Sequence, residues 1–177
     1  MDREFQEVFP GVQVESGLEE LLQGVTVQRV SLSKKKDLLR IYLHSRQWIH
    51  KRYIYQLEEL LKQQLFANVP MQVKIIERFQ LSAQYTPENL LEVYRSSIQM
   101  ELKRHSVFLF NLFYTAKISF PESDVMKLEL ADSVIAREKE EELVRILEKI
   151  FCERCGLDLK IHPELVEREG ESKALKN

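Results

Sequence analysis

The stretch that decides the fold is VTVQRVSLSKKKDLLRIYLHSRQWIHKRYIYQLEELLKQQLFANVPMQVKIIERF, residues 25–79. Within it, Leu39, Ile41 and Leu43 alternate with Arg40 and Tyr42, which is the period-two pattern of a strand with one buried face. A polar run at 34–37 precedes this strand and predicts a turn. Residues 25–32 and 38–43 are therefore expected to form a β-hairpin.

The second part of the same stretch changes to helical spacing. Its apolar residues share one face at i, i+3, i+7 and i+11, namely Ile54, Leu57, Leu61 and Leu65. The sequence Asn68-Val69-Pro70 ends that helix, and a third strand begins near Val73. Residues 25–79 are therefore predicted to be a β-β-α-β domain, a three-stranded sheet with one helix across it.

The sequence on either side of this domain predicts an N-terminal segment and a linker. Ser16 with Glu19 three residues later is a capping-box pattern, which predicts a short helix ending at Gly24 within residues 1–24. Residues 80–87, QLSAQYTP, are short, polar and end in proline, so they are predicted to link the first domain to a second one.

Residues 88–165 are predicted to be a second α+β domain of order α-α-β-α-β. Thr86-Pro87-Glu88 opens a helix through His105, and an apolar helical segment follows at 106–114, whose aromatic residues are expected in the core. Residues 125–130 alternate as a strand, Asp132 or Ser133 caps a long helix, and residues 157–161 form the last strand. Residues 166–177 are predicted to be a charged tail, and both halves contain strand, helix, strand.

Length and composition narrow the class of protein. The 177 residues are 44% hydrophobic and carry a formal charge of −2. No apolar run approaches the ~20 residues that a membrane span needs, and no signal-peptide pattern opens the chain. Two cysteines are too few for a disulfide framework. We therefore expect a soluble, cytoplasmic protein with one ordinary domain or two small ones.

Positive charge is concentrated between residues 29 and 52, where Asp37 is the only acid. The eight cations are Arg29, Lys34, Lys35, Lys36, Arg40, Arg46, Lys51 and Arg52. Such a run is either a solvated face or a surface that binds an acidic partner or nucleic acid. The aromatic residues among them, such as Tyr42 and Trp48, suit single-strand stacking, but they suit packing against the sheet equally well. We take the eight cations as the candidate partner-binding residues.

No catalytic or metal-binding motif stands out. Cys152-Glu-Arg-Cys155 is the only metal-like spacing, but a structural zinc site needs four ligands and only His162 lies nearby. The pair also follows a long helix, where the helix dipole disfavours a thiolate. Phosphate-binding loops and nucleophile elbows are absent, and no carboxylate cluster suggests metal-dependent catalysis. We expect no catalytic residue, metal or cofactor in the chain.

The whole pattern resembles the N-terminal region of the PolC-type DNA polymerase III alpha subunit, a bacterial replicative polymerase. The resemblance covers about residues 25–166. It rests on the basic hairpin before RIYLHSRQWIHKRYIYQLEELLKQQL and on the segments MQVKII, ENLLEVYRSSIQMEL, KLELADS and CGLDLKIHPELV. It implies that the first domain is similar to the carboxy-terminal domain of the clamp-loader tau subunit and that the region binds tau. It also implies a K-homology-like second domain, although this sequence lacks the G-x-x-G loop with which such modules clamp nucleic acid.

The resemblance further implies a much larger protein. In that family an oligonucleotide-binding domain, a phosphoesterase-like domain with an inserted 3'-5' exonuclease, and the magnesium-dependent DNA polymerase domains follow. We expect these 177 residues to be an amino-terminal fragment without activity of its own, a non-catalytic module of DNA replication. Its expected partners are tau and other replisome proteins and no membrane. The alternatives are direct contact with DNA phosphates through the basic hairpin, or an enzyme with an unrecognised site.

Overall fold

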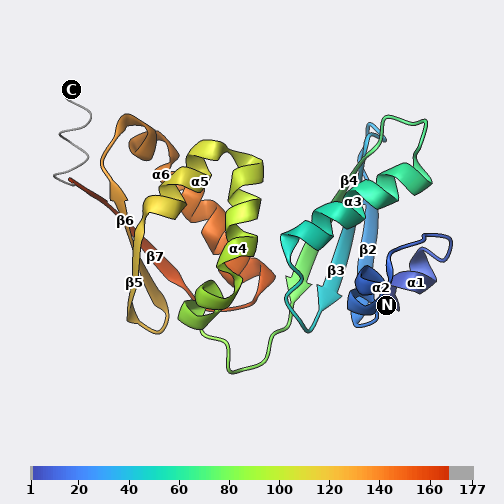
Figure 1. Ribbon diagram of the computed structural model, residues 1–177, viewed down its shortest axis with the longest axis horizontal. Coiled ribbons are helices and arrows are strands. Elements are labelled where there is room, and N and C mark those ends of the chain that lie inside the picture. The colour runs from blue at the N-terminus through green and yellow to red at the C-terminus, as the bar shows by residue number, and fades with distance from the viewer. Residues whose placement is uncertain (1, 168–177) are drawn as a thin grey trace. The chain divides into compact units, whose positions relative to one another are not determined.

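The structure, a computed structural model, describes residues 2–167 and divides into two compact units between Ser82 and Ala83. In the first unit, helix α3 lies across one face of a sheet whose strand order is β1-β2-β3-β4 (Figure 1). Strands β2 and β3 pair antiparallel, and β3 and β4 pair parallel. The elements are β1 (Arg3–Glu4), α1 (Phe5–Val8), α2 (Ser16–Leu22), β2 (Val25–Leu32), β3 (Leu38–Ser45), α3 (Lys51–Leu65) and β4 (Gln72–Phe79).

The predicted hairpin, helix and third strand are confirmed, but the sheet has four strands where three were predicted. The extra strand is β1, which pairs with β2, and Phe5 behind it is buried. The capping box predicted at Ser16 is wrong. Glu15 has the extended backbone of an N-cap residue and its side chain makes no cap hydrogen bond, so Ser16 is already the first helical residue.

The core of the first unit lies between α3 and the sheet. Ile54, Leu57 and Leu61 of the predicted helical stripe are at most 1% exposed, and they share the core with Ile41 and Leu43 of β3. The fourth residue predicted for the stripe, Leu65, is 43% exposed because it is the last residue of α3. The alternation of β3 therefore decides which of its side chains face α3 and which face outward.

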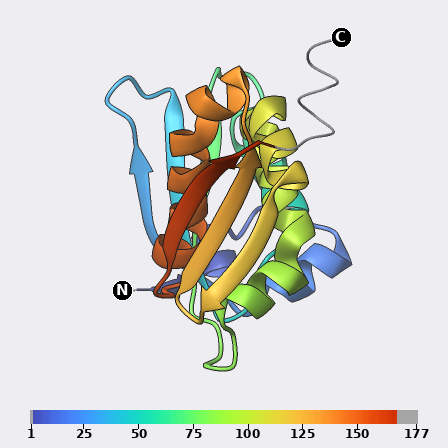
Figure 2. The same ribbon diagram turned by 90° about the vertical axis from the view of Figure 1, so that its left-hand side faces the viewer.

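The second unit places its helices on one face of a sheet of order β5-β6-β7 (Figure 2). Strands β5 and β6 pair antiparallel, and β6 and β7 pair parallel. The elements are α4 (Pro87–His105), α5 (Val107–Thr115), β5 (Lys117–Glu122), β6 (Val125–Ala131), α6 (Val134–Glu148), the π-helix η1 (Lys149–Arg154) and β7 (Lys160–Val166). No described helix is long and apolar enough to cross a membrane.

Two strands of the second unit differ from the prediction. Strand β5 was missed, so the order is α-α-β-β-α-β. Strand β7 begins at Lys160, not at residue 157. After η1 the chain turns at Gly156, which has a φ of 66°, and the backbone N–H of Leu157 still donates to the carbonyl oxygen of Phe151 in η1 at 3.0 Å, so pairing with β6 starts later. Val166, assigned to the tail, pairs with Ala131. Residues 168–177, the rest of the predicted tail, lie outside the described residues.

The helix starts of the second unit follow the sequence signals. The Oγ1 atom of Thr86 accepts a hydrogen bond from the backbone N–H of Asn89, and the Oγ atom of Ser133 accepts one from Ala136. The aromatic residues of α5 were expected in the core, and this is only partly right. Phe113 is buried, whereas Phe108 and Tyr114 are exposed.

Both units contain the same β-β-α-β path: an antiparallel hairpin, then a helix that crosses over to a parallel third strand. The sequence indicated only strand, helix, strand in the second half, because the first strand of its hairpin was not recognised. The shared topology gives each unit one sheet face that packs on helices and one outer face.

Candidate partner-binding face

The hairpin between β2 and β3 ends in a lysine-rich turn held by Ser33. The backbone N–H of Lys36 donates to the carbonyl oxygen of Ser33 at 2.9 Å, and the Ser33 hydroxyl donates to Asp37 Oδ1 at 2.8 Å. Lys36 has a φ of 57°, the left-handed conformation that glycine and asparagine adopt most easily. Lys34, Lys35 and Lys36 are all exposed at this tip.

The outer face of the first sheet carries a second group of cations. Side chains alternate along each strand, and the buried residues of β3 and β4 face α3. The opposite positions of β2, β3 and β4 therefore point outward. The charged side chains at these outward positions are all positive, and we call them the basic sheet face: Arg29, Arg40, Lys74 and Arg78.

Pairing between strands brings the members of the basic sheet face together. Arg40 and Lys74 are register partners across β3 and β4. Arg29 lies opposite Tyr42, and its guanidinium carbon is 4.4 Å from the centre of the tyrosine ring, a cation–π contact. Tyr42 therefore supports the arginine and does not form part of the core.

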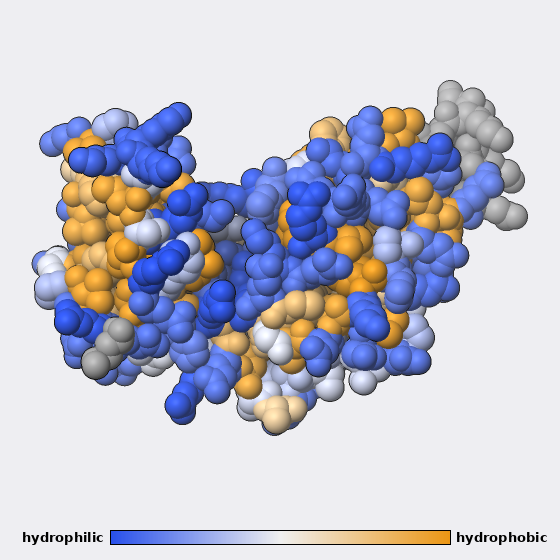
Figure 3. Space-filling view, turned by 180° about the vertical axis from the view of Figure 1, so that it is seen from behind, coloured by the Kyte–Doolittle hydropathy of each residue, from blue (hydrophilic) through white to orange (hydrophobic). Residues whose placement is uncertain are grey.

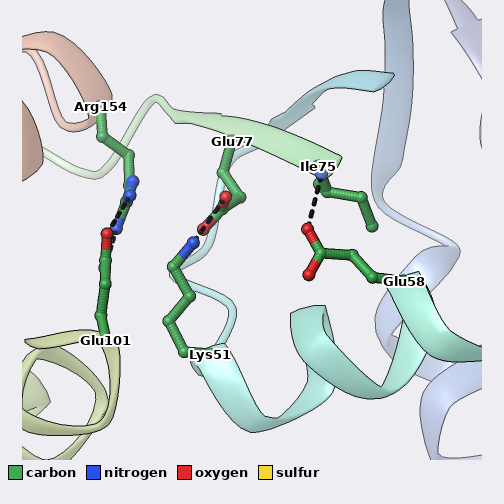
Figure 4. Close-up of polar contacts among 6 residues, drawn as sticks. All are labelled: Lys51, Glu58, Ile75, Glu77, Glu101 and Arg154. Atoms are coloured by element: carbon green, nitrogen blue, oxygen red, sulfur yellow. Dashed lines mark hydrogen bonds and ion pairs between the residues drawn. The ribbon is translucent and has the colours of Figure 1, made fainter. Parts of the chain in front are cut away.

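Lys51 is not on the surface. Its Nζ atom is 3.0 Å from Glu77 Oε1, and both side chains are buried (Figure 4). Because Glu77 is the only carboxylate on β2, β3 or β4 and points toward α3, the negative charge of these strands faces inward while four positive charges face outward. Lys51 stabilises the attachment of α3 to β4 and is not available to a partner.

The eight predicted cations thus fall into separate places. Three lie at the hairpin tip and two, Arg29 and Arg40, on the basic sheet face. Arg46 and Arg52 are exposed beyond the other end of β3, and the Arg52 guanidinium donates to the Tyr53 hydroxyl at 2.9 Å. Strand β3, whose eight residues span about 23 Å at a rise of about 3.3 Å per residue, lies between the tip and Arg46. The eight cations do not form one site.

Lys74 and Arg78 were missed by the sequence analysis. Their signal was present in the alternation of QVKIIERF along β4, where both occupy the same side as Gln72. What the sequence did not provide was the parallel register, which pairs Lys74 with Arg40 and Arg78 with His44. A residue 34 positions away in the chain thereby becomes the neighbour of Arg40.

Comparison with known proteins identifies the region that carries this face. Residues 4–75 match the family described as DNA polymerase III polC-type N-terminus I. Over these residues the chain is similar to the PolC-type family, and we call residues 4–75 the PolC-type region. The PolC-type region begins in β1 and ends inside β4, so it includes Arg29, Arg40 and Lys74 of the basic sheet face, while Arg78 lies beyond it. The match points to a module of a replicative DNA polymerase.

The other comparisons add no argument about function. No curated protein matches the chain. Among solved structures, one titled "Structure of the PrgH periplasmic domain" is similar at 13% identity and a TM-score of 0.27, covering 90% of this chain and 66% of that one. So low a TM-score carries no inference about fold, and the chain spans less than two thirds of that protein.

The cysteine pair of the second unit lies at the end of η1 in a setting that disfavours thiolate chemistry. Burial raises the pKa of Cys152, whose thiol donates to the carbonyl oxygen of Leu159 at 3.6 Å, and Cys155 is buried. Among residues 2–167, no three or more histidine, cysteine, aspartate or glutamate residues are grouped so as to hold a metal ion. That the pair binds no zinc stays a prediction.

Proposed function

We propose that the first unit is a non-catalytic docking module of a cytoplasmic bacterial replicative polymerase and that its partner is the clamp-loader tau subunit. The observation that carries this proposal is the sorting of charge on strands β2–β4, which the PolC-type region covers up to residue 75. All charged side chains on the outer face of β2–β4 are positive, and their one carboxylate is turned inward. A surface of one sign raises the association rate with a partner of opposite charge and selects against partners of like charge.

Catalysis belongs, on this proposal, to other parts of the full-length polymerase. Nucleotide transfer and exonuclease chemistry both use carboxylates that converge on metal ions. The two carboxylates buried among residues 2–167, Glu77 and Glu101, are instead paired with cations of the protein, Lys51 and Arg154. Magnesium is accordingly assigned to the full-length protein and no cofactor to these residues.

Direct binding of DNA is the second candidate function, and the Arg29–Tyr42 contact supports it. Arginine beside an aromatic ring is a combination that single-strand binding surfaces use. We extend this candidate to the second unit, for which we propose a K-homology-like role despite its extra strand and the missing G-x-x-G loop. DNA binding predicts a steep dependence on salt, with a slope near −0.9 for each neutralised phosphate on duplex DNA.

The test compares two double variants that remove two positive charges each. Arg40→Gln with Lys74→Gln changes the basic sheet face, whereas Lys117→Gln with Lys160→Gln changes two exposed lysines on the outer face of the second sheet. We expect the first variant to lower the association rate with purified tau about tenfold at low salt. The second variant should leave that rate unchanged.

The outcomes separate the two candidate functions. Equal effects of the two variants on tau binding would contradict docking through the basic sheet face. If tau binding is unaffected but the first variant lowers the salt slope of DNA binding by about 1.8, which is two phosphate contacts, DNA is the partner.

A further inference from the structure

The edge of a β-sheet can pair with a strand of another chain. Of the four sheet edges within residues 2–167, three carry a feature that discourages such pairing. At the β4 edge, Glu58 of α3 accepts a hydrogen bond from the backbone N–H of Ile75 at 2.7 Å (Figure 4). The edge strands of the second unit each contain a proline, Pro121 in β5 and Pro163 in β7, which removes a backbone donor.

The fourth edge is closed over only part of its length. Strand β1 pairs with Thr26 and Val27 of β2, and a β-bulge follows between Val27 and Arg29. Beyond the bulge, β2 continues for residues 28–32, and within the described part of the first unit no strand pairs with these residues on the side away from β3. This segment is the open edge, and we use that name for residues 28–32.

The hydrogen-bond pattern of the hairpin fixes which backbone groups face outward. The N–H of Ser33 donates to the carbonyl oxygen of Leu38, so Ser33 and Leu38 form a hydrogen-bonded pair. Such pairs alternate with non-hydrogen-bonded pairs in an antiparallel ladder. Ser31 therefore bonds to β3 as Ser33 does, whereas the N–H and C=O groups of Val30 and Leu32 point away from β3.

The side chains of the open edge differ on its two faces. Val30 and Leu32 pair with the buried residues Ile41 and Leu39 and so lie on the α3 side, yet they remain 42% and 48% exposed. Arg29 lies on the opposite side, with the basic sheet face. Figure 3 shows hydrophobic surface directly beside strongly hydrophilic side chains on this unit.

We propose that the open edge binds an extended segment of the partner protein as an additional strand, in line with β1, and that this segment alternates apolar and acidic residues. Its backbone would bond to Val30 and Leu32. Its apolar side chains would cover those two residues, and its acidic side chains would lie beside Arg29 and the lysines of the hairpin tip. The proposal rests on the docking function above and specifies how the partner is held.

Amide hydrogen exchange of the whole chain, read residue by residue by NMR, tests this directly. The probe is a synthetic peptide of alternating valine and glutamate. We expect it to slow exchange of the Val30 and Leu32 amides at least tenfold. The exchange rate of the Ser31 amide, which is already bonded to β3, should change little. A matched peptide, N-methylated on the amides that face β2, keeps the charge and should give no protection. Unchanged exchange of both amides at the highest soluble peptide concentration overturns the proposal.

Variants at Val30 separate backbone bonding from apolar contact. Val30→Pro removes the outward N–H without touching the ladder to β3 and should weaken peptide binding at least tenfold, whereas Val30→Ala keeps the N–H and should weaken it less. Leu32→Pro serves as a second case if Val30→Pro does not fold. Equal affinity of the proline and alanine variants contradicts strand addition.

The two proposals fail in different ways. Loss of tau binding in the Arg40/Lys74 variant without protection of Val30 and Leu32 leaves charge-driven docking in place and removes strand addition. Protection of both amides by the peptide in a protein that does not bind tau supports strand addition and contradicts the assignment of the partner.

Discussion

The two sheets of this protein share one topology and differ in the charge of their outer faces. In the first, the charged residues that face outward are Arg29, Arg40, Lys74 and Arg78, and none of these four makes an ion pair within residues 2–167. In the second, Lys127 lies 3.2 Å from Glu129 and 3.3 Å from Glu164, and hydrogen bonds to both carboxylates raise the pKa of that lysine.

The fold alone therefore does not make either face a binding surface. Each face is set by which residues the register places side by side. The second sheet neutralises its own charge across neighbouring strands, so it offers little attraction to a charged partner. The first keeps its carboxylate inside and its cations outside, which produces a positive surface field.

The units also differ in how they use a buried ion pair. In the first, Lys51 attaches the start of α3 to β4 through Glu77. In the second, the Nη1 and Nη2 atoms of Arg154 each donate to one carboxylate oxygen of Glu101 at 2.8 Å, which attaches η1 to α4 (Figure 4). Breaking such a pair leaves a buried charge, which is far more costly than replacing both partners by apolar groups.

The substitution Lys51→Met is therefore expected to have the largest effect on stability. Removing the lysine leaves the Glu77 carboxylate in the core, and we expect the first unit to lose about 3–5 kcal/mol of stability. Urea unfolding followed by amide signals of each unit measures this. The double variant Lys51→Met with Glu77→Leu should recover most of the loss. If the double variant is as unstable as the single one, the lysine contributes through some other contact.

A smaller effect is expected from removing a hydroxyl helix cap, a kind of cap that within residues 2–167 occurs in the second unit, at Thr86, Ser106 and Ser133. Ser133→Ala deprives the N–H of Ala136 of its acceptor and should cost about 1 kcal/mol. Ser16→Ala in α2 is the matched control, since that serine caps nothing. Thermal unfolding of the two variants compares them directly, and an equal loss would mean that Ser16 has a role which the cap geometry does not reveal.

These cases explain how far the sequence could predict the structure. Local sequence signals predicted the elements that depend on neighbouring residues. These are strand β3, from its alternation, helix α3, from its apolar spacing, and the helix starts at Thr86 and Ser133, from their caps. Strand β5 was missed because Pro121 interrupts a short alternating run. The basic sheet face was predicted only in part, because the pairing of Lys74 with Arg40 arises from a parallel crossover that no local pattern encodes.

The hairpin tip offers a stabilising substitution. Lys36 is the only non-glycine residue with positive φ within residues 2–167, and glycine avoids the strain of about 1–2 kcal/mol that a side chain has there. Because glycine also loses more entropy on folding, we expect Lys36→Gly to stabilise the first unit by about 0.5–1 kcal/mol. Chemical denaturation checks it. Lys35→Gly, one residue earlier, should be neutral or destabilising, and a gain there instead would contradict the strain argument.

The smallest expected effect is a pH dependence at the start of α3. The Nδ1 atom of His50 accepts a hydrogen bond from the N–H of Arg52 at 3.0 Å and so acts as the N-cap. Burial, and then the charge of Arg52, lower the pKa of His50 from 6.5. The folded unit thus binds a proton less readily than the unfolded chain does. This contribution to stability is complete above pH 6.5 and is lost as the pH falls through the lowered pKa.

His50→Asn tests that pH dependence, because asparagine caps a helix without titrating. We expect the unfolding temperature of the parent protein to fall more steeply than that of the variant as the pH is lowered below 6.5. His44, His105 and His162 are present in both proteins, so the difference between the two curves isolates His50. The effect should be confined to the first unit, because the second unit caps its helices with Thr86, Ser106 and Ser133, which do not titrate in this range. If the unfolding temperature depends on pH in the same way in parent and variant, protonation of His50 does not break the hydrogen bond that caps α3.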